Sequence, residues 1–199
     1  MDDTLGFFNK IGYTLYLSLL WFICCIPIFT IGASTTAYCY VLNKMIFGKE
    51  GYIARDFFKA FKDNFKSATK VWLIFMVAIA VVVMDYYIIV FLSGEYGGMY
   101  YALIPAYIMI LCLLWAMLIY VFPYMAKFED TTKNIIKNAF LMSTRHFGYT
   151  ILLMVLDALI IFVGIYVFVI FLLLAPALIG FINMGVLGFV FGRYQYQDR

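Results

Sequence analysis

Long apolar segments alternate with short amphipathic segments along this chain of 199 residues. Each strongly apolar segment reaches about the 20 residues that a helix needs to cross a hydrocarbon core. The strongly apolar segments are 8–28, 68–92, 100–126, 147–169 and 172–192. A weaker segment, 30–47, carries several hydroxyl groups. The pattern predicts an all-α, polytopic membrane protein in which residues 1–199 form a single integral membrane domain.

We expect about six transmembrane helices, paired as three helical hairpins at about 8–47, 68–126 and 147–192. Hydropathy alone also allows segment 30–47 to be re-entrant or interfacial, so five spans are the alternative. Three prolines favour six spans, because each comes shortly before a new helix would start and proline is tolerated in the first turn. They are Pro27, Pro105 and Pro176.

Two amphipathic segments join the hairpins, at about 53–66 and 131–146. In the first, four phenylalanines fall on one helical face and mainly lysines on the other, which is typical of an elbow helix lying in the headgroup region. The phenylalanines are Phe57, Phe58, Phe61 and Phe65. Basic residues near an anionic leaflet are attracted to it. We therefore expect both elbows to contact anionic headgroups or a partner protein. The candidate residues are Arg55, Lys59, Lys62, Lys66, Lys70, Lys133, Lys137 and Arg145.

Composition and charge distribution agree with this architecture. Hydrophobic residues make up 66% of the chain and charged residues only 13%, so one soluble core could not bury the apolar groups. A net charge of +3 does not indicate nucleic-acid binding. The positive-inside rule places the basic connections and the C-terminus in the cytoplasm, and six spans place the N-terminus there too.

The chain resembles a known family over residues 21–74, where P-x-x-T-I-G-A-S-T-T-A is followed by D-F-F-K-x-F-K-x-N-F-K-x-A-T. These motifs are similar to those of the YesL-like family of bacterial multipass membrane proteins, whose function is unknown. Members are often encoded beside carbohydrate ABC importers and polysaccharide-degrading enzymes. The resemblance implies a protein of the bacterial plasma (inner) membrane with an accessory role in carbohydrate uptake, and importer subunits as partners. It supplies no catalytic residues.

Few residues in the chain are candidates for catalysis or metal binding. His146 is the one histidine, and the cysteines Cys24, Cys25, Cys39 and Cys112 lie in apolar segments without metal-ligand spacing. No phosphate loop or nucleophile motif is present. We therefore expect a non-enzymatic protein without catalytic residues, metal or cofactor.

Asp157 is the most unusual polar residue, because it lies about eight residues inside an apolar segment. An ionised carboxylate there costs ~2.5 to 3.5 kcal/mol. Together with Ser34, Thr35, Thr36 and Tyr38 it forms a candidate intramembrane polar site. One interpretation is a small secondary transporter or channel; the other is a carboxyl group that hydrogen-bonds between helices.

Gly188 and Gly192 form a G-x-x-x-G pattern in the last apolar segment. This pattern is typical of helix packing in membranes. It predicts a helix contact and allows a homo-oligomer.

Overall fold

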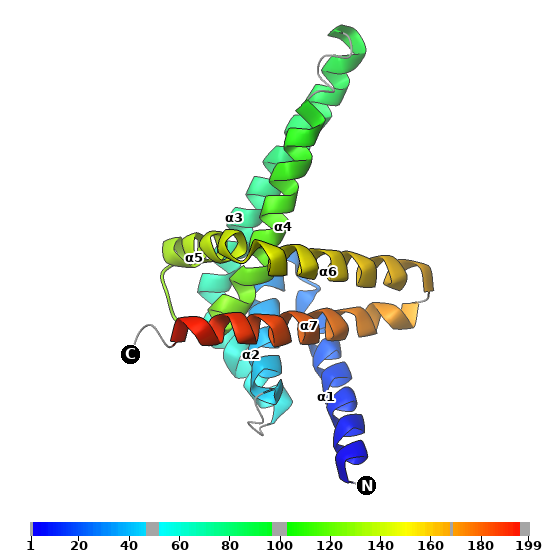
Figure 1. The fold of residues 1–199 in the computed structure, drawn as a ribbon, viewed down its shortest axis with the longest axis vertical. Helices are drawn as coiled ribbons and strands as arrows, with labels where there is room; N and C mark the ends of the chain where they lie inside the picture. Colours follow the sequence, from blue (N-terminus) through cyan, green and yellow to red (C-terminus); the bar gives the residue numbers. More distant parts are fainter. Residues whose placement is uncertain (1, 47–51, 97–102, 168, 196–199) are drawn as a thin grey trace.

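The protein is built from helices (Figure 1), and the computed structural model describes residues 2–46, 52–96, 103–167 and 169–195. Within these ranges no residue belongs to a β-strand, which confirms the predicted all-α class. The elements are α1 (Asp2–Cys25), the short 3-10 helix η1 (Ile28–Thr30), α2 (Ile31–Ile46), α3 (Ile53–Tyr96), α4 (Ile104–Lys127), α5 (Thr132–Arg145), α6 (Phe147–Val167) and α7 (Val169–Gln195).

Helix α3 differs from the sequence prediction. The sequence predicts an elbow helix at 53–66 followed by a separate span from residue 68, but both belong to one helix of 44 residues, which rises about 66 Å. The reason is local: the chain has no Gly or Pro between Ile53 and Ser93, so nothing ends the helix where its surface changes from basic to apolar. Helix α3 therefore joins the amphipathic segment to the span without a bend-forming residue.

Helix α2 lies at the centre of the bundle and contacts α1, α3, α4 and α7. It packs closely on α3 at Gly32, where a Cβ atom would lie 2.6 Å from the Ala68 carbonyl oxygen and 2.6 Å from the Trp72 Cβ atom. Trp72 also donates a hydrogen bond of 2.8 Å from its indole nitrogen to the Ile28 carbonyl oxygen. The absence of a side chain at Gly32 thus lets α2 pack directly on the backbone of α3.

Helices α5 and α6 meet at a bend of 95° after Arg145. Helix α5 occupies the segment in which the second elbow is predicted. One face of α5 is buried against the bundle, and Lys133 and Lys137 are exposed on the other. The elbow predicted at 131–146 is thus a separate helix, whereas the elbow predicted at 53–66 is part of α3.

Helices α6 and α7 pack against each other and run in opposite directions, as Figure 1 shows in yellow and red. In this view the pair runs across the hairpin of α3 and α4. Pro176 lies inside α7 rather than at a helix start, whereas Pro105 is in the first turn of α4 and Pro27 immediately precedes η1. The proline pattern therefore marks two helix starts correctly and the third wrongly.

Among the residues whose surroundings the structure describes, two helical segments are long and apolar enough to cross a membrane: α3 over Ile53–Phe91, and α4. The count becomes three if the bent pair of α5 and α6 is one span. Helix α2, with 16 residues, rises only about 24 Å, less than a ~30 Å hydrocarbon core. The apolar helices are compatible with a membrane protein, and the arrangement of six spans is not confirmed.

Candidate functional site

The hydroxyl side chains of α2 bind neighbouring backbone and side chains. Ser34 is fully buried and donates a 3.0 Å hydrogen bond to the Cys24 carbonyl oxygen of α1. Trp21 of α1 donates from its indole nitrogen to Thr35 Oγ1 at 3.1 Å. Thr36, also fully buried, donates to a carbonyl one turn earlier in α2. These hydroxyls therefore hold α1 and α2 together and satisfy backbone groups.

Tyr38 joins three helices. Its hydroxyl donates to the Pro176 carbonyl oxygen of α7 at 3.0 Å and lies 3.3 Å from Ser18 Oγ of α1. Helix α7 comes close here because residue 180 is glycine: a Cβ atom on Gly180 would lie 2.5 Å from Tyr38 Cε1. The phenol is thus a packing element between α1, α2 and α7.

Asp157 of α6 pairs with Asn183 of α7, a partner that the sequence analysis did not identify. Their side chains are only 4% and 8% exposed, and Asn183 Nδ2 donates to Asp157 Oδ2 at 3.1 Å. The other carboxyl oxygen of Asp157, Oδ1, and the amide oxygen of Asn183 are both buried without a hydrogen-bond partner among the described residues. No hydrogen bond in the described part of the chain joins this pair to the α2 hydroxyls. The predicted polar site therefore consists of two separate clusters.

The two unpartnered oxygens bear on the charge of Asp157. An ionised carboxylate is only an acceptor, so it offers nothing to the Asn183 oxygen, whereas a carboxylic acid has one O–H donor. Burying an unpaired charge in an apolar interior costs far more than burying a neutral group. The neutral acid therefore fits these surroundings better than the carboxylate.

Helix α3 carries five basic residues on one face. All five side chains are exposed, and their spacing of 4, 3, 4 and 4 residues repeats close to the helical period. We call Arg55, Lys59, Lys62, Lys66 and Lys70 the basic stripe. Asp56 does not offset this charge, because it forms an ion pair of 2.5 Å with Lys44 of α2.

The opposite face of this part of α3 is aromatic and packed. Phe57 is fully buried, and its ring stacks with that of Phe61 at a centroid distance of 6.3 Å. Phe61 contacts Phe65 in turn, at 5.5 Å. The ring contacts lie within α3, and it is the burial of Phe57 against the bundle that leaves the basic stripe facing outward.

Helix α5 presents the second set of basic residues. Lys133, Lys137 and Arg145 are exposed, whereas Ile135 and Ala139 are buried on the other face. The Thr131 hydroxyl accepts a hydrogen bond from the Asn134 backbone at 3.4 Å, so it caps the N-terminus of α5. The predicted candidate residues of the second elbow are thus accessible on one helix.

A polar network holds α5 against α4. Tyr124 donates to Asp130 Oδ2 at 3.1 Å and accepts from Asn138 Nδ2 at 2.8 Å. Asp130 Oδ1 accepts from the Asn134 side chain and from the Thr131 backbone, both at 2.8 Å. The Asn134 amide, followed by the Thr131 N–H, lowers the pKa of Asp130. The sequence analysis missed this network, although an acid directly before a helix start is a capping signal.

The bend between α5 and α6 is also held by hydroxyl groups. Thr150 of α6 is buried and donates to the Ser143 carbonyl oxygen of α5 at 2.8 Å. The Tyr120 hydroxyl of α4 lies 2.9 Å from Thr150 Oγ1. A bend leaves carbonyl groups of the preceding turn without helical partners. Thr150 satisfies one of these groups, and the Tyr120 hydroxyl of α4 helps to hold Thr150 in place.

The remaining candidates give no further site. The four cysteines are free. Among the described residues, no group of three or more His, Cys, Asp or Glu side chains is placed to hold a metal ion. The packing role of Gly188 and Gly192 stays a prediction, and Gly192 lies outside the residues whose surroundings are described.

The comparisons with known proteins agree with the position of the motifs. Residues 14–86 are similar to a family described as a protein of unknown function, DUF624. This region covers the second half of α1, all of α2, and α3 as far as Tyr86. It is consistent with the YesL-like resemblance, which no named relative confirms. The chain matches no curated protein and no solved structure.

Proposed function

We propose that the chain is a non-enzymatic accessory or assembly factor of a larger membrane complex. The basic stripe of α3 and the exposed cations of α5 serve as its docking surface. The observation that carries the proposal is the basic stripe itself, whose side chains are all exposed along about 22 Å of one helix face. Such a surface favours an acidic partner or an anionic membrane surface.

The hydrogen bonds of α2 support a packing role rather than a transport path. A path for a polar substrate needs side chains that are open to water, as polar groups inside membranes face a cavity or one another. Ser34 and Thr36 are fully buried, and both donate to backbone carbonyl groups. This favours the accessory role over the transporter.

The partner that we propose is a carbohydrate ABC importer. The support is the resemblance to the YesL-like family, whose members are encoded beside such importers. A partner of this kind has cytoplasmic surfaces that basic residues on the inner side could reach. The proposal therefore also places the chain in the bacterial plasma membrane, with several spans and with both termini in the cytoplasm.

Orientation can be tested separately from partner binding. A reporter that is active only in the cytoplasm, fused after Arg199, should be active, and one that is active only outside should not. The same pair of reporters before Met1 distinguishes six spans from five, because an odd number of spans puts the two termini on opposite sides.

Affinity purification in mild detergent tests the docking surface. We expect importer permease or ATPase subunits to remain bound to the wild-type chain at near-stoichiometric levels. Reversal of charge at Lys59, Lys62, Lys133 and Lys137 to Glu should abolish this capture. Substitution of the same four residues by Arg is the matched control and should preserve it. Purification of the chain alone from cells that express an importer contradicts stable docking.

A second candidate function is a small proton-coupled or cation-coupled transporter that uses Asp157. The observation in its favour is the pair of buried oxygens without partners at Asp157 and Asn183. In proteoliposomes, Asp157→Asn should then abolish substrate-coupled flux while the protein stays folded. Unchanged flux in this variant, or no flux in the wild type, rejects the transporter.

A further inference from the structure

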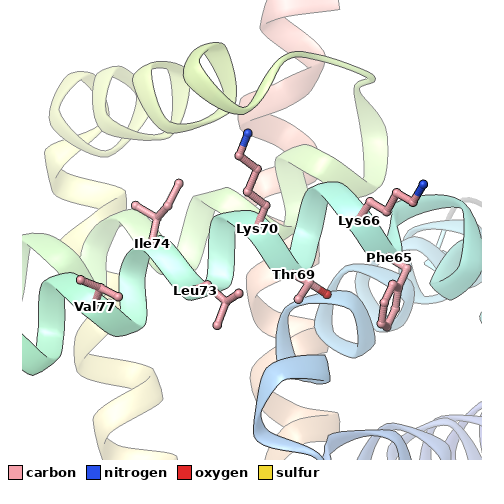
Figure 2. A pocket seen from close by; sticks show the side chains of 7 residues that line it. All are labelled: Phe65, Lys66, Thr69, Lys70, Leu73, Ile74 and Val77. Carbon is pink, nitrogen blue, oxygen red and sulfur yellow. The ribbon is translucent and has the colours of Figure 1, made fainter.

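The surface of α3 has a hollow at the end of the basic stripe. Figure 2 shows its lining, and the volume is about 580 Å³. All the lining residues belong to α3: Phe65, Lys66, Thr69, Lys70, Leu73, Ile74 and Val77. We call this feature the α3 hollow. It begins at the last two lysines of the basic stripe and ends in the apolar part of the helix.

The basic end of the α3 hollow offers two cations side by side. Lys66 and Lys70 are one helical turn apart, and Figure 2 shows their side chains extending from the same side of α3. Both are exposed. Asp63, one turn before Lys66, is the nearest acidic residue along the helix, but in the described structure it forms no ion pair with either lysine. Both ammonium groups are therefore available to a ligand.

The other end of the α3 hollow is apolar and uncovered. Leu73, Ile74 and Val77 are 45%, 43% and 63% exposed, and they lie in the helix that is long and apolar enough to cross a membrane. Between the two ends lies Thr69, whose hydroxyl is buried without a hydrogen-bond partner among the described residues. Over two helical turns the lining thus changes from charged to hydrocarbon.

We propose that the α3 hollow binds a phospholipid with an anionic headgroup. The Lys66 and Lys70 ammonium groups contact the phosphate oxygens, and an acyl chain lies along Leu73, Ile74 and Val77. Cations followed at once by exposed apolar side chains on one helix face match the order of groups in a lipid at the cytoplasmic leaflet. An acidic protein segment has the charge but not the hydrocarbon chain.

The test uses the purified full-length chain in neutral detergent. Phosphatidylglycerol and phosphatidylcholine are titrated in parallel, and retained lipid is counted by native mass spectrometry. The wild type should retain one phosphatidylglycerol in preference to phosphatidylcholine. The double variant Lys66→Gln/Lys70→Gln should lower this preference by about 30-fold, since each basic residue near an anionic surface contributes roughly a fivefold factor.

A matched control separates a binding site from general attraction. Lys59→Gln/Lys62→Gln removes the same charge from exposed positions of the same helix outside the α3 hollow, and should lower the preference by much less than Lys66→Gln/Lys70→Gln. An equal loss in both double variants, or in neither, overturns the proposal. The same titration with an acidic peptide and no lipid is a further control. If the wild type binds this peptide and Lys66→Gln/Lys70→Gln loses that binding, the result also overturns the proposal, in favour of a protein ligand.

The outcome is independent of the proposed partner. The lipid experiment uses the purified chain alone, and importer capture can be repeated with Lys66→Gln/Lys70→Gln. If the variant loses its lipid preference but still captures the importer, the result supports the lipid site. The other basic residues would then be the ones that dock the importer. Loss of capture with intact lipid preference rejects the lipid site as the role of these two lysines.

Discussion

Asn183 of α7 donates a hydrogen bond of 3.1 Å to the Asp157 carboxyl group of α6, inside two helices that are otherwise strongly apolar. Both side chains are more than nine-tenths buried. The contact joins the two helices of the last hairpin at one defined register, because an apolar surface alone fixes the sliding of one helix along another only weakly. The pair therefore has a structural role whether or not it also carries a proton.

Removing one partner of this pair should be costly. Asn183→Leu leaves the Asp157 carboxyl group buried without a donor, so we expect a loss of about 1–3 kcal/mol in the free energy of unfolding. Asp157→Asn should be tolerated, because two amides can still bond. The measurement is thermal unfolding in detergent, where a change of 1 kcal/mol shifts Tm by about 2–4 °C for a chain of this size.

The double variant Asp157→Leu/Asn183→Leu is the control for that experiment. Because replacing both polar groups removes the unsatisfied one, it should recover much of the stability lost in Asn183→Leu. Additive losses in the double variant contradict a direct pairing of the two side chains.

Gly32 should not tolerate even one added methyl group. In Gly32→Ala the new Cβ atom would lie 2.6 Å from the Ala68 carbonyl oxygen, a backbone atom that cannot turn aside. We expect a loss of about 1–3 kcal/mol from overpacking, measured as the change in Tm in detergent. Gly180→Ala should cost less, because the closest atoms there belong to the side chains of Tyr38 and Leu42.

Gly185→Ala is the matched control for the glycine series. It lies in the same helix as Gly180, and a Cβ atom there meets nothing within 4 Å. The alanine should be neutral or stabilise the helix by up to about 1 kcal/mol. Equal effects of Gly32→Ala and Gly185→Ala argue against close packing of α2 on α3.

Thr150→Val should loosen the bend between α5 and α6. The variant keeps the shape of the side chain but removes the donor to the Ser143 carbonyl oxygen, so we expect a loss of about 1–2 kcal/mol. Thr144→Val is a fair comparison, because Thr144 is exposed and donates only to a carbonyl of its own helix; it should stay within about 0.5 kcal/mol of the wild type. Hydrogen exchange of α5 amides should rise in Thr150→Val only.

Acid should weaken the contact between α4 and α5. Hydrogen bonds from Asn134 and the Thr131 N–H lower the pKa of Asp130 in the folded chain, so the contribution of this carboxylate is present above its ordinary pKa of ~3.9 and is lost as the pH falls through the lowered value. Hydrogen exchange of α5 between pH 6 and pH 3 measures this. Asp130→Asn should show a smaller dependence, and an identical profile in both proteins contradicts the prediction.

Helix type and approximate position could be predicted from the sequence because they depend on local pattern. The apolar run after Val71 and the proline at position 105 mark α3 and α4. The amphipathic spacing of Lys133 and Lys137 against Ile135 and Ala139 marks α5. In each case residues within a few turns contain the signal.

Relations between distant segments could not be predicted in this way. No sequence pattern near Asn183 identifies Asp157 as its hydrogen-bond partner. The pairing depends on how α6 and α7 pack against each other. The contact of Gly32 with Ala68 likewise joins α2 and α3, and hydropathy does not determine the register of these two helices. The change from a basic to an apolar surface between Lys66 and Ala68 predicts the end of one helix and the start of another, whereas the structure has one continuous helix. The surface pattern depends on what a helix face contacts and not on where the helix ends.

The continuity of α3 has a mechanical consequence. Helix α3 has no hinge residue along its apolar and basic parts, and α2 holds it at Ala68 and Trp72, about a third of the way from its first residue. Helix α3 also packs on α4, so it moves together with its neighbours and not about a single pivot. A displacement of the basic stripe is therefore passed on to the apolar end of the same helix, because no hinge between them absorbs it.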